Sequence, residues 1–250
     1  MDLNLKSPIA IGNTAKIYLC ENKIIKIFND YLPVSESLYE ANKQKLAYLF
    51  GLAVPKILDV TEINGKQALI MEYIKGRTIG DLLDENMEQA EYYMSTSIGI
   101  QQKIHMVVPD SLEPMTEKLR RQIELAPQLD ERHKSTLLKK LESMTFEKRL
   151  CHGDFHLNNL IMSDNEVKII DWVDASAGDI RADIYRTYLL YSQFSMELAN
   201  MYLRLYCEKS GLSREEIFQW APIIAAARLS ENVSSEKTER LMDIINSYCP

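Results

Sequence analysis

The residues of this chain that could best perform chemistry lie between Cys151 and Asp171. Asp154 is followed five residues later by Asn159, and a second acid, Asp171, comes twelve residues after that amide. One carboxylate to take a hydroxyl proton and two oxygen ligands for Mg²⁺ are the groups that phosphoryl transfer requires. In this interpretation Asp154 orients the attacking hydroxyl as catalytic base. Asn159 and Asp171 hold the metal ion that neutralises charge on the nucleotide phosphates.

A β-hairpin would explain the spacing between the two metal ligands. Residues 160–162 and 167–170 are short β-prone runs, and residues 163–166 between them are polar and turn-forming. Because the two ends of a hairpin lie side by side, Asn159 and Asp171 are expected to reach one metal ion.

Two other interpretations fit this stretch less well. His152 and His156 are four residues apart, a spacing that suits a metal site on a helix, but Gly153 disfavours a helix and the hairpin follows too soon. A structural turn with incidental polar residues leaves the Asp, Asn, Asp series unexplained.

The motif His152-Gly153-Asp154 with Asn159, followed by Ile170-Asp171-Trp172, resembles that of the aminoglycoside phosphotransferase and choline kinase family. These are relatives of protein kinases that phosphorylate small molecules. The resemblance implies an α+β, two-lobed protein-kinase-like fold, with a small antiparallel β-rich N-terminal lobe and a large, mainly helical C-terminal lobe. It also implies ATP or GTP and Mg²⁺ as cofactors, and it extends over most of the chain.

The upstream features implied by this resemblance appear in order. Gly12, Asn13 and Thr14 lie between β-prone segments, and Gly12 with Asn13 favours a tight turn whose amides could cover phosphates. Without the downstream motif, an ordinary hairpin would be the favoured interpretation. The turn is not a Walker-type loop, since no Gly-x-x-x-x-Gly-Lys-Ser/Thr occurs in the chain.

Lys26 lies in an alternating strand, residues 23–28, and the resemblance implies that it binds the α and β phosphates and pairs with a carboxylate on the next helix. Glu40 is the expected partner, and Glu36 is the competitor. A helix over about residues 35–50 would leave Glu40 beside a buried stripe of Leu38, Ala41, Leu46 and Leu49. The run 37–40 also fits a capping box, but Pro33 and Ser35 supply an earlier helix start, so the ion pair is preferred.

Residues 68–76 read as a strand that breaks at Gly76. By resemblance this is the hinge between the lobes, where backbone groups from Glu72 to Ile74 would bind the adenine edge. The expected domains are therefore residues 1–75, for nucleotide binding, and 76–250, for catalysis and substrate binding.

Composition agrees with two lobes. A chain of 250 residues that is 46% hydrophobic can bury roughly 70–75% of its surface. The four cysteines are far apart and form no Cys-x-x-Cys pair, which indicates reduced thiols rather than a disulfide framework.

No apolar stretch reaches the ~18–20 residues of a membrane span, so a cytoplasmic protein is expected. The net charge of −7 disfavours a nucleic-acid partner, and the basic cluster 118–121 is interpreted as a solvated helix face. Oligomeric state stays open.

Helical patterns are expected at eight places beyond the hinge. They cover residues 78–84, 88–105, 115–125, 130–144, 182–194, 196–209, 213–229 and 236–247. Pro222 predicts a kink or boundary inside the seventh. Thr78 with Asp81 and Ser213 with Glu216 resemble capping boxes.

Two acids after the metal motif receive structural roles. Asp183 is expected to brace the catalytic loop through hydrogen bonds to its backbone, and Asp179 to cap the following helix. His156 lies in the loop, either as a contact to a base or phosphate or as a hydrogen-bonded structural imidazole.

The chain is therefore expected to be a small-molecule kinase that phosphorylates a hydroxyl of an aminoglycoside-like, amino-alcohol or sugar substrate. The alternatives are a catalytically silent nucleotide-binding module and a protein kinase. The short segment after Asp171, without an Ala-Pro-Glu, leaves little room for the activation segment of a protein kinase. Carboxylates such as Asp174 or Glu231 near the mouth could receive a cationic acceptor, but a neutral metabolite fits as well.

Overall fold

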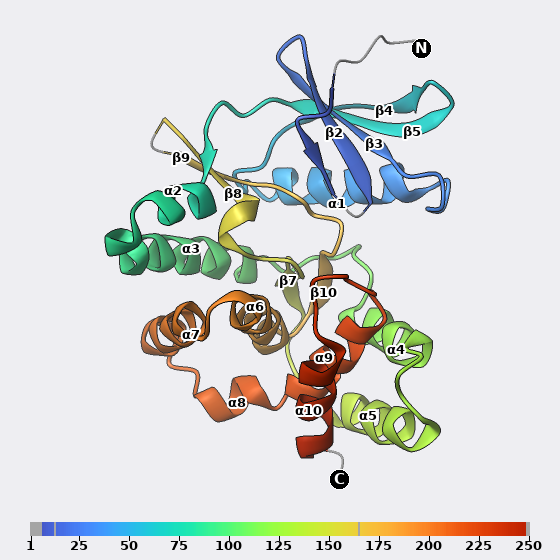
Figure 1. Cartoon of the computed structure of the whole chain (residues 1–250), viewed down its shortest axis with the longest axis vertical. Coiled ribbons are helices and arrows are strands. Elements are labelled where there is room, and N and C mark those ends of the chain that lie inside the picture. The colour runs from blue at the N-terminus through green and yellow to red at the C-terminus, as the bar shows by residue number, and fades with distance from the viewer. Residues whose placement is uncertain (1–6, 13, 165, 249–250) are drawn as a thin grey trace. The chain divides into compact units, whose positions relative to one another are not determined.

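The computed structural model describes residues 7–12, 14–164 and 166–248. The chain forms two compact units (Figure 1). The first, here the sheet unit, runs to Glu85 and also contains Asn158–Val173. The second, the helical unit, contains Asn86–Leu157 and continues from Asp174. This division differs from the one expected at residue 75, because the strand Arg77–Thr78 pairs with the hairpin around residue 165.

The sheet unit is built on a five-stranded antiparallel sheet in the order β1-β2-β3-β5-β4. Its strands are β1 (Ala10–Ile11), β2 (Ala15–Cys20), β3 (Lys23–Phe28), β4 (Ile57–Ile63) and β5 (Lys66–Glu72). Glu21 with Asn22, and Asn64 with Gly65, have positive φ at both turn positions, as the type I′ turn of a two-residue hairpin requires.

Side chains alternate across β3, and this alternation sets the direction of Lys26. Ile25 and Ile27 pack in a cluster with Ile63 and Ala68 on one face. Phe28 belongs to a second cluster that includes Ala41 of the helix α1 (Glu36–Leu49). Lys26 has the parity of Phe28, so it lies on the face that α1 covers.

The buried stripe of α1 is mainly polar, which corrects the expected burial of Leu38, Leu46 and Leu49, whereas Ala41 is buried as expected. Leu38 is 51% exposed and Leu49 is 79% exposed. The buried residues are Ser37, Glu40, Ala41, Lys43, Gln44 and Ala47. The polar members find partners, as where Gln44 Nε2 donates to the carbonyl of Pro55 at 2.7 Å. A buried polar stripe is stable only when its groups are hydrogen-bonded in this way.

A second, three-stranded sheet has the order β6-β8-β9. Its strands are β6 (Arg77–Thr78), β8 (Leu160–Ser163) and β9 (Glu166–Ile169), and the short helices α2 (Ile79–Glu85) and η2 (Leu157–Asn159) adjoin it in the chain. The predicted hairpin is confirmed, with Leu160 opposite Ile169. Gly76 approaches it closely, because a Cβ there would lie 2.2 Å from the carbonyl oxygen of Met162.

The helical unit contains one two-stranded sheet, β7 (Arg149–Cys151) with β10 (Ser176–Gly178). The helices of this unit are η1 (Met87–Gln89), α3 (Ala90–His105), α4 (Met115–Leu125), α5 (Glu131–Ser143), α6 (Ile180–Phe194), α7 (Met196–Ser210), α8 (Arg214–Phe218), α9 (Ala221–Leu229) and α10 (Thr238–Tyr248). The α+β class, with an antiparallel N-terminal part and a helical C-terminal part, is confirmed.

Local sequence signals fix several helix ends. Ser213 and Glu216 form the predicted capping box at the start of α8. Pro222 is indeed at a boundary, since the single helix expected over 213–229 is two helices, and Pro222 lies in the first turn of α9. Gly211 ends α7 with a φ of 77°, a left-handed conformation that favours glycine.

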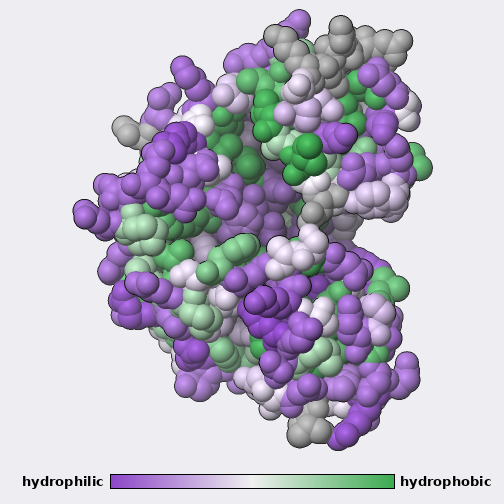
Figure 2. Space-filling model, in the orientation of Figure 1, coloured by the Kyte–Doolittle hydropathy of each residue, from purple (hydrophilic) through white to green (hydrophobic). Residues whose placement is uncertain are grey.

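Hydrophilic residues cover most of the face shown in Figure 2, and hydrophobic residues occur there in small groups. Among the described residues, no helix has both the length and the apolar character needed to cross a bilayer.

Candidate active site

The predicted ion pair between Lys26 and Glu40 is present. Lys26 Nζ donates to both carboxylate oxygens of Glu40 at 2.8 Å, and both side chains are buried. Burial alone would lower the pKa of Lys26, but the charges of Asp171 and Glu40 outweigh it and hold that pKa above its usual range. The lysine therefore stays positively charged, and Glu40 of α1 orients its ammonium group.

Asp171 is the second carboxylate next to this lysine, with its Oδ1 3.3 Å from Nζ. Asp171 has a φ of 63°, which is uncommon for a residue with a Cβ and turns the chain sharply as it leaves β9. The amide of Ile170 donates to the carbonyl of Asn159 at 3.0 Å, so the two ends of the hairpin are adjacent as expected. The amide oxygen of Asn159 and the carboxylate of Asp171 are hard oxygen ligands of the type that suits Mg²⁺.

Lys43 is a functional candidate that sequence reasoning missed. Its Nζ donates to the carbonyl oxygen of Val173 and lies 4.0 Å from the ring centroid of Tyr39. Glu40 and Lys43 are three residues apart on one buried face of α1. The same helix therefore contacts both Lys26 and the backbone that follows Asp171. The available signal was a lysine three residues after the expected carboxylate, a spacing that places both on one face of a helix.

The expected phosphate-covering turn and hinge stay predictions. The amide of Gly12 donates to the carbonyl of Ala15 at 2.9 Å and closes the turn between β1 and β2, and Thr14 follows in it. Asn13 lies outside the described residues. Glu72 ends β5, and its amide and side chain both bond to the backbone of Lys56. Ile74 is buried.

Asp154, the expected base, lies in the helical unit next to two imidazoles. His156 Nε2 lies 3.4 Å from Asp154 Oδ2, and the Asp154 amide donates to His152 Nδ1 at 3.3 Å. Burial alone would raise the pKa of Asp154. The hydrogen bond and charge of His156, with the charges of Arg186 and His152, outweigh burial and hold the pKa well below its usual range. The carboxylate is thus ionised at neutral pH.

The loop that carries Asp154 is braced by Asp183, as predicted. The amide of Gly153 donates to Asp183 Oδ1 at 2.7 Å. Gly153 has a φ of 82°, and a Cβ there would lie 2.4 Å from the carbonyl oxygen of Asp174, so only glycine fits. Asp179 caps α6 as expected by accepting from the amide of Arg181.

A buried polar network holds Asp183 from the other side. His105 Nε2 is 2.9 Å from Asp183 Oδ2, and Gln101 Nε2 donates to the same oxygen at 3.1 Å. His105 Nδ1 is 2.8 Å from the hydroxyl of Tyr206. Because an ionised carboxylate only accepts, Nε2 is the donor to Asp183, and a neutral His105 then accepts from Tyr206.

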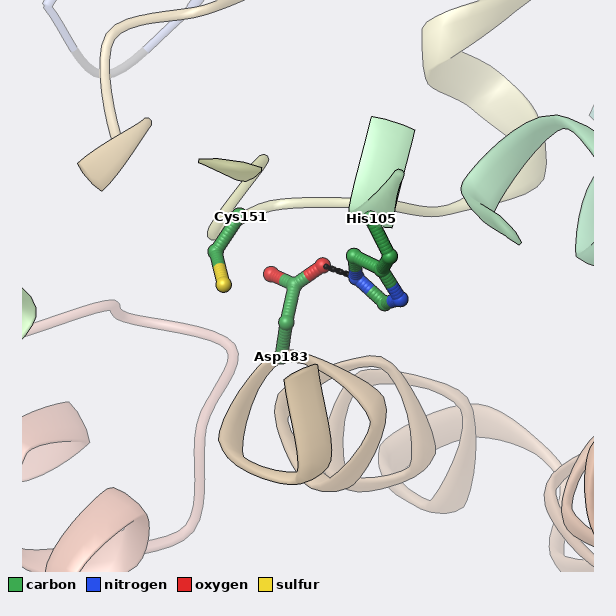
Figure 3. Close-up of side chains that lie close together, drawn as sticks. All are labelled: His105, Cys151 and Asp183. Carbon is green, nitrogen blue, oxygen red and sulfur yellow. Dashed lines mark hydrogen bonds and ion pairs between the residues drawn. The ribbon is translucent and has the colours of Figure 1, made fainter. Parts of the chain in front are cut away.

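Cys151 lies beside His105 and Asp183, a combination that could suggest a metal site (Figure 3). The geometry favours a structural cluster instead. The Cys151 thiol donates to the carbonyl of Asp179 at 3.5 Å, and burial raises its pKa, so the thiolate needed for a metal is disfavoured.

A cavity opens next to Gly153 within the helical unit. It has a volume of about 40 Å³. Lys118, Asp174, Arg186 and Glu231 line it. Lys118 Nζ is 2.6 Å from Asp174 Oδ1, so its interpretation as part of a solvated helix face is wrong. Arg186 donates to the carbonyl of Gly153 at 3.2 Å and to Glu231 at 2.8 Å. Sequence pattern alone did not identify Lys118 or Arg186, because their partners are distant in the chain.

Comparison with protein-family models assigns most of the chain to one family. The model of the phosphotransferase enzyme family matches residues 7–218. A stretch of 204 residues is 26% identical to human acyl-CoA dehydrogenase family member 11, and it covers 71% of this chain but 26% of that protein. The chain thus spans about a quarter of the length of this curated relative.

The fold is similar to solved structures of two kinds of kinase. A thermostable mutant of aminoglycoside phosphotransferase APH(4)-Ia, in a ternary complex with AMP-PNP and hygromycin B, aligns with a TM-score of 0.72 and 12% identity. The alignment covers 98% of this chain and 94% of that one. Choline kinase LicA from Streptococcus pneumoniae aligns with a TM-score of 0.68 and 18% identity, again over 98% and 94% of the chains.

Proposed function

We propose that this chain, which belongs to the phosphotransferase enzyme family, is a phosphotransferase with an alcohol group as acceptor, and more narrowly a small-molecule kinase that transfers the γ-phosphate of ATP. The observation that carries this proposal is the position of Lys26, whose Nζ contacts both Glu40 and Asp171 inside the sheet unit. A lysine held between a helix carboxylate and a candidate metal ligand is the arrangement that nucleotide kinases need.

In the proposed reaction the sheet unit holds the nucleotide. Lys26 binds the α and β phosphates, and Glu40 keeps the ammonium group in place. The turn with Gly12, Asn13 and Thr14 covers the phosphates, and the backbone from Glu72 to Ile74 binds the adenine edge. Asn159 and Asp171 would hold Mg²⁺, which neutralises charge on the transferred phosphoryl group.

Asp154 acts on the acceptor. Its depressed pKa makes it a weak base, and this suits phosphoryl transfer, because the transition state is loose and little proton transfer is needed before the phosphoryl group moves. We therefore assign Asp154 mainly to orienting the acceptor hydroxyl as a hydrogen-bond acceptor. His156 and Arg186 keep that carboxylate ionised, and Asp183 fixes its loop through Gly153.

ATP is the preferred donor in this proposal, with GTP as the alternative, because one similar structure contains the ATP analogue AMP-PNP. The same structure contains hygromycin B, and another similar protein is a choline kinase, which supports a small acceptor. The scattered cysteines support a cytoplasmic site of action, where thiols stay reduced.

The decisive experiment compares the wild type with Asp154→Asn. Loss of the orienting carboxylate should lower turnover of the best acceptor by about 10²–10⁴-fold, while the affinity for Mg²⁺ and AMP-PNP stays within about twofold, because the nucleotide groups lie in the other unit. Turnover is measured as ADP release across a panel of aminoglycosides, amino alcohols, sugars and simple alcohols.

Asp164→Asn is the matched control, since Asp164 lies in the exposed turn of the hairpin, and it should behave as the wild type. Near-normal turnover by Asp154→Asn would refute the role of Asp154. A wild type that binds AMP-PNP but neither phosphorylates any acceptor nor hydrolyses ATP slowly would favour the silent nucleotide-binding module.

A further inference from the structure

We propose that the acceptor alcohol of this enzyme places an uncharged, apolar body in the cavity beside Gly153, so that the substrate is a compact neutral alcohol rather than an aminoglycoside or a quaternary amine. This inference rests on the proposed function and narrows the class of its acceptor. The cavity is the relevant site because Gly153, one of its lining residues, precedes the orienting carboxylate of Asp154 directly.

The carboxylates that line the cavity already accept hydrogen bonds from other groups of the protein. Asp174 Oδ1 accepts from Lys118 Nζ at 2.6 Å. Glu231 Oε2 accepts from Arg186 at 2.8 Å and also from Arg228. Asp183 accepts from the amide of Gly153 and pairs with His105. The expectation that Asp174 or Glu231 receives a cationic acceptor therefore lacks a free carboxylate to support it.

A cationic acceptor would also lie beside two cations of the cavity wall. Lys118 and Arg186 both line the cavity, and their side chains are only 15% and 8% exposed. An ammonium group placed beside them would be desolvated near like charges, or would have to displace one of them from its carboxylate. Either course costs binding free energy that an uncharged group does not lose.

The remaining cavity wall favours apolar contact. Met115, Leu119, Ile224 and Ala227 contribute side chains to it. Among the described residues that line it, none is Phe, Tyr or Trp, so the wall offers no aromatic face for a quaternary ammonium. The cavity itself has a volume of about 40 Å³, so the group that enters it must be compact.

The test uses pairs of alcohols that differ in charge but hardly in shape. Choline is compared with its carbon analogue, in which a tert-butyl group replaces the trimethylammonium group, and ethanolamine is compared with propanol. Phosphorylation is measured with ATP and Mg²⁺, and binding is measured in parallel with AMP-PNP and Mg²⁺. The neutral member of each pair should have the higher kcat/KM and the lower Kd, by at least about tenfold.

Two variants connect this preference to the cavity. Lys118→Met removes a cation and leaves Asp174 without its lysine, so the preference for the neutral member should shrink by about tenfold. Gln122→Glu adds a carboxylate at the wall with little change of shape and should shift the ratio in the same direction. Lys148→Met and Gln128→Glu make the same chemical changes at exposed positions outside the cavity and should keep the wild-type ratio.

The ratio of the two kcat/KM values within a pair does not change when part of the protein is unfolded. If Lys118→Met does not fold, Gln122→Glu still tests the inference. Equal or better use of choline and ethanolamine, an unchanged ratio in Gln122→Glu, or no binding of either neutral alcohol would overturn the inference. The proposed function fails separately, when no alcohol of any charge is phosphorylated and Asp154→Asn leaves the slow hydrolysis of ATP unchanged.

Discussion

At the scale of single residues, the chemistry depends on side chains whose charges are fixed by buried partners. Lys26 is the centre of one such group, because its ammonium contacts Glu40 and Asp171. Asp154 is the centre of the other, with His156 and Arg186 around it. In both groups a charge that burial alone would suppress is retained because an opposite charge lies within a few ångströms.

The Lys26–Glu40 pair should behave as one unit in a double-mutant cycle. Lys26→Met should lower kcat/KM by loosening the hold on the nucleotide phosphates, and Glu40→Gln should cause a related, smaller loss by releasing Lys26 toward Asp171. The double variant should lose less than the sum of the two single losses, by about 0.5–3 kcal/mol of transition-state free energy.

Glu36→Gln is the control for this cycle, because Glu36 was the competing partner and lies in the first turn of α1. It should leave kcat/KM close to the wild-type value. Strictly additive losses for Lys26→Met and Glu40→Gln would remove Glu40 from the proposed nucleotide site.

The ionisation of Asp154 makes a prediction about pH. An ordinary aspartate has a pKa of about 3.9, and the depressed pKa of Asp154 keeps the carboxylate ionised well below neutral pH. Its ionised form stabilises the folded protein above the unfolded-state pKa, and this contribution is lost as the pH falls toward the folded-state pKa. In His156→Gln the pKa should rise, so the acidic limb of the kcat profile should move to higher pH.

This limb is measured from pH 7 downward while circular dichroism confirms that the protein stays folded. His133→Gln is the control, since His133 bonds to Asp130 instead of the catalytic loop. An identical acidic limb in His156→Gln and wild type would show that His156 does not sustain the charge of Asp154.

At the scale of elements, the hairpin β8–β9 positions the candidate metal ligands, and Gly76 lets the chain pass close to it. A Cβ at Gly76 would meet the Met162 carbonyl at 2.2 Å, so Gly76→Ala must push β8 away. We expect a loss of about 1–3 kcal/mol of stability. Half-maximal activity should also require more Mg²⁺, because Asn159 and Asp171 move with the hairpin.

Gly99→Ala is the matched comparison. Gly99 lies inside α3, and a Cβ there would meet nothing within 4 Å. The same substitution should therefore stabilise the protein by up to about 1 kcal/mol and leave the Mg²⁺ titration unchanged. Both free energies come from urea unfolding. Equal effects of the two substitutions would mean that the close approach at Gly76 does not constrain the hairpin.

Helices and strands were predictable from the sequence where neighbouring residues in the chain determine them. The hairpin followed from two β-prone runs around a polar turn, and the start of α8 followed from Ser213 and Glu216. The buried face of α1 was not predictable from hydrophobic residues, because Glu40, Lys43 and Gln44 are buried through partners elsewhere in the chain. The hydrogen bonds of Lys118 and Arg186 were not predictable for the same reason. Hydrophobic periodicity identifies the buried face of a helix, but it does not identify the residues that this face contacts.

At the scale of the whole molecule, the two tryptophans report on different units. Trp172 lies in the sheet unit and Trp220 in the helical unit, and both are fully buried. In Trp220→Phe, the fluorescence of Trp172 should report a melting temperature that rises by about 5–10 °C when Mg²⁺ and AMP-PNP are present at about 100 times the dissociation constant.

Trp172→Phe then follows the helical unit through Trp220. The same rise would mean that the two units melt together, and a smaller rise would mean that they melt separately. No rise in the Trp172 signal would contradict nucleotide binding by the sheet unit. Asp171→Ala in the Trp220→Phe background should lose the part of the rise that depends on Mg²⁺.

The chain crosses between the two units three times, and this has a consequence for its synthesis. The sheet unit needs residues 158–173, so it stays incomplete for the roughly 4–14 s in which a ribosome adds residues 86–157 at about 5–20 residues per second. During that interval β6 has no strand to pair with, and Lys26 has Glu40 but not Asp171. The nascent chain therefore exposes the unpaired edge of β6, and Lys26 lacks one of its two acidic partners. We expect chaperones to bind the nascent chain mainly during this interval.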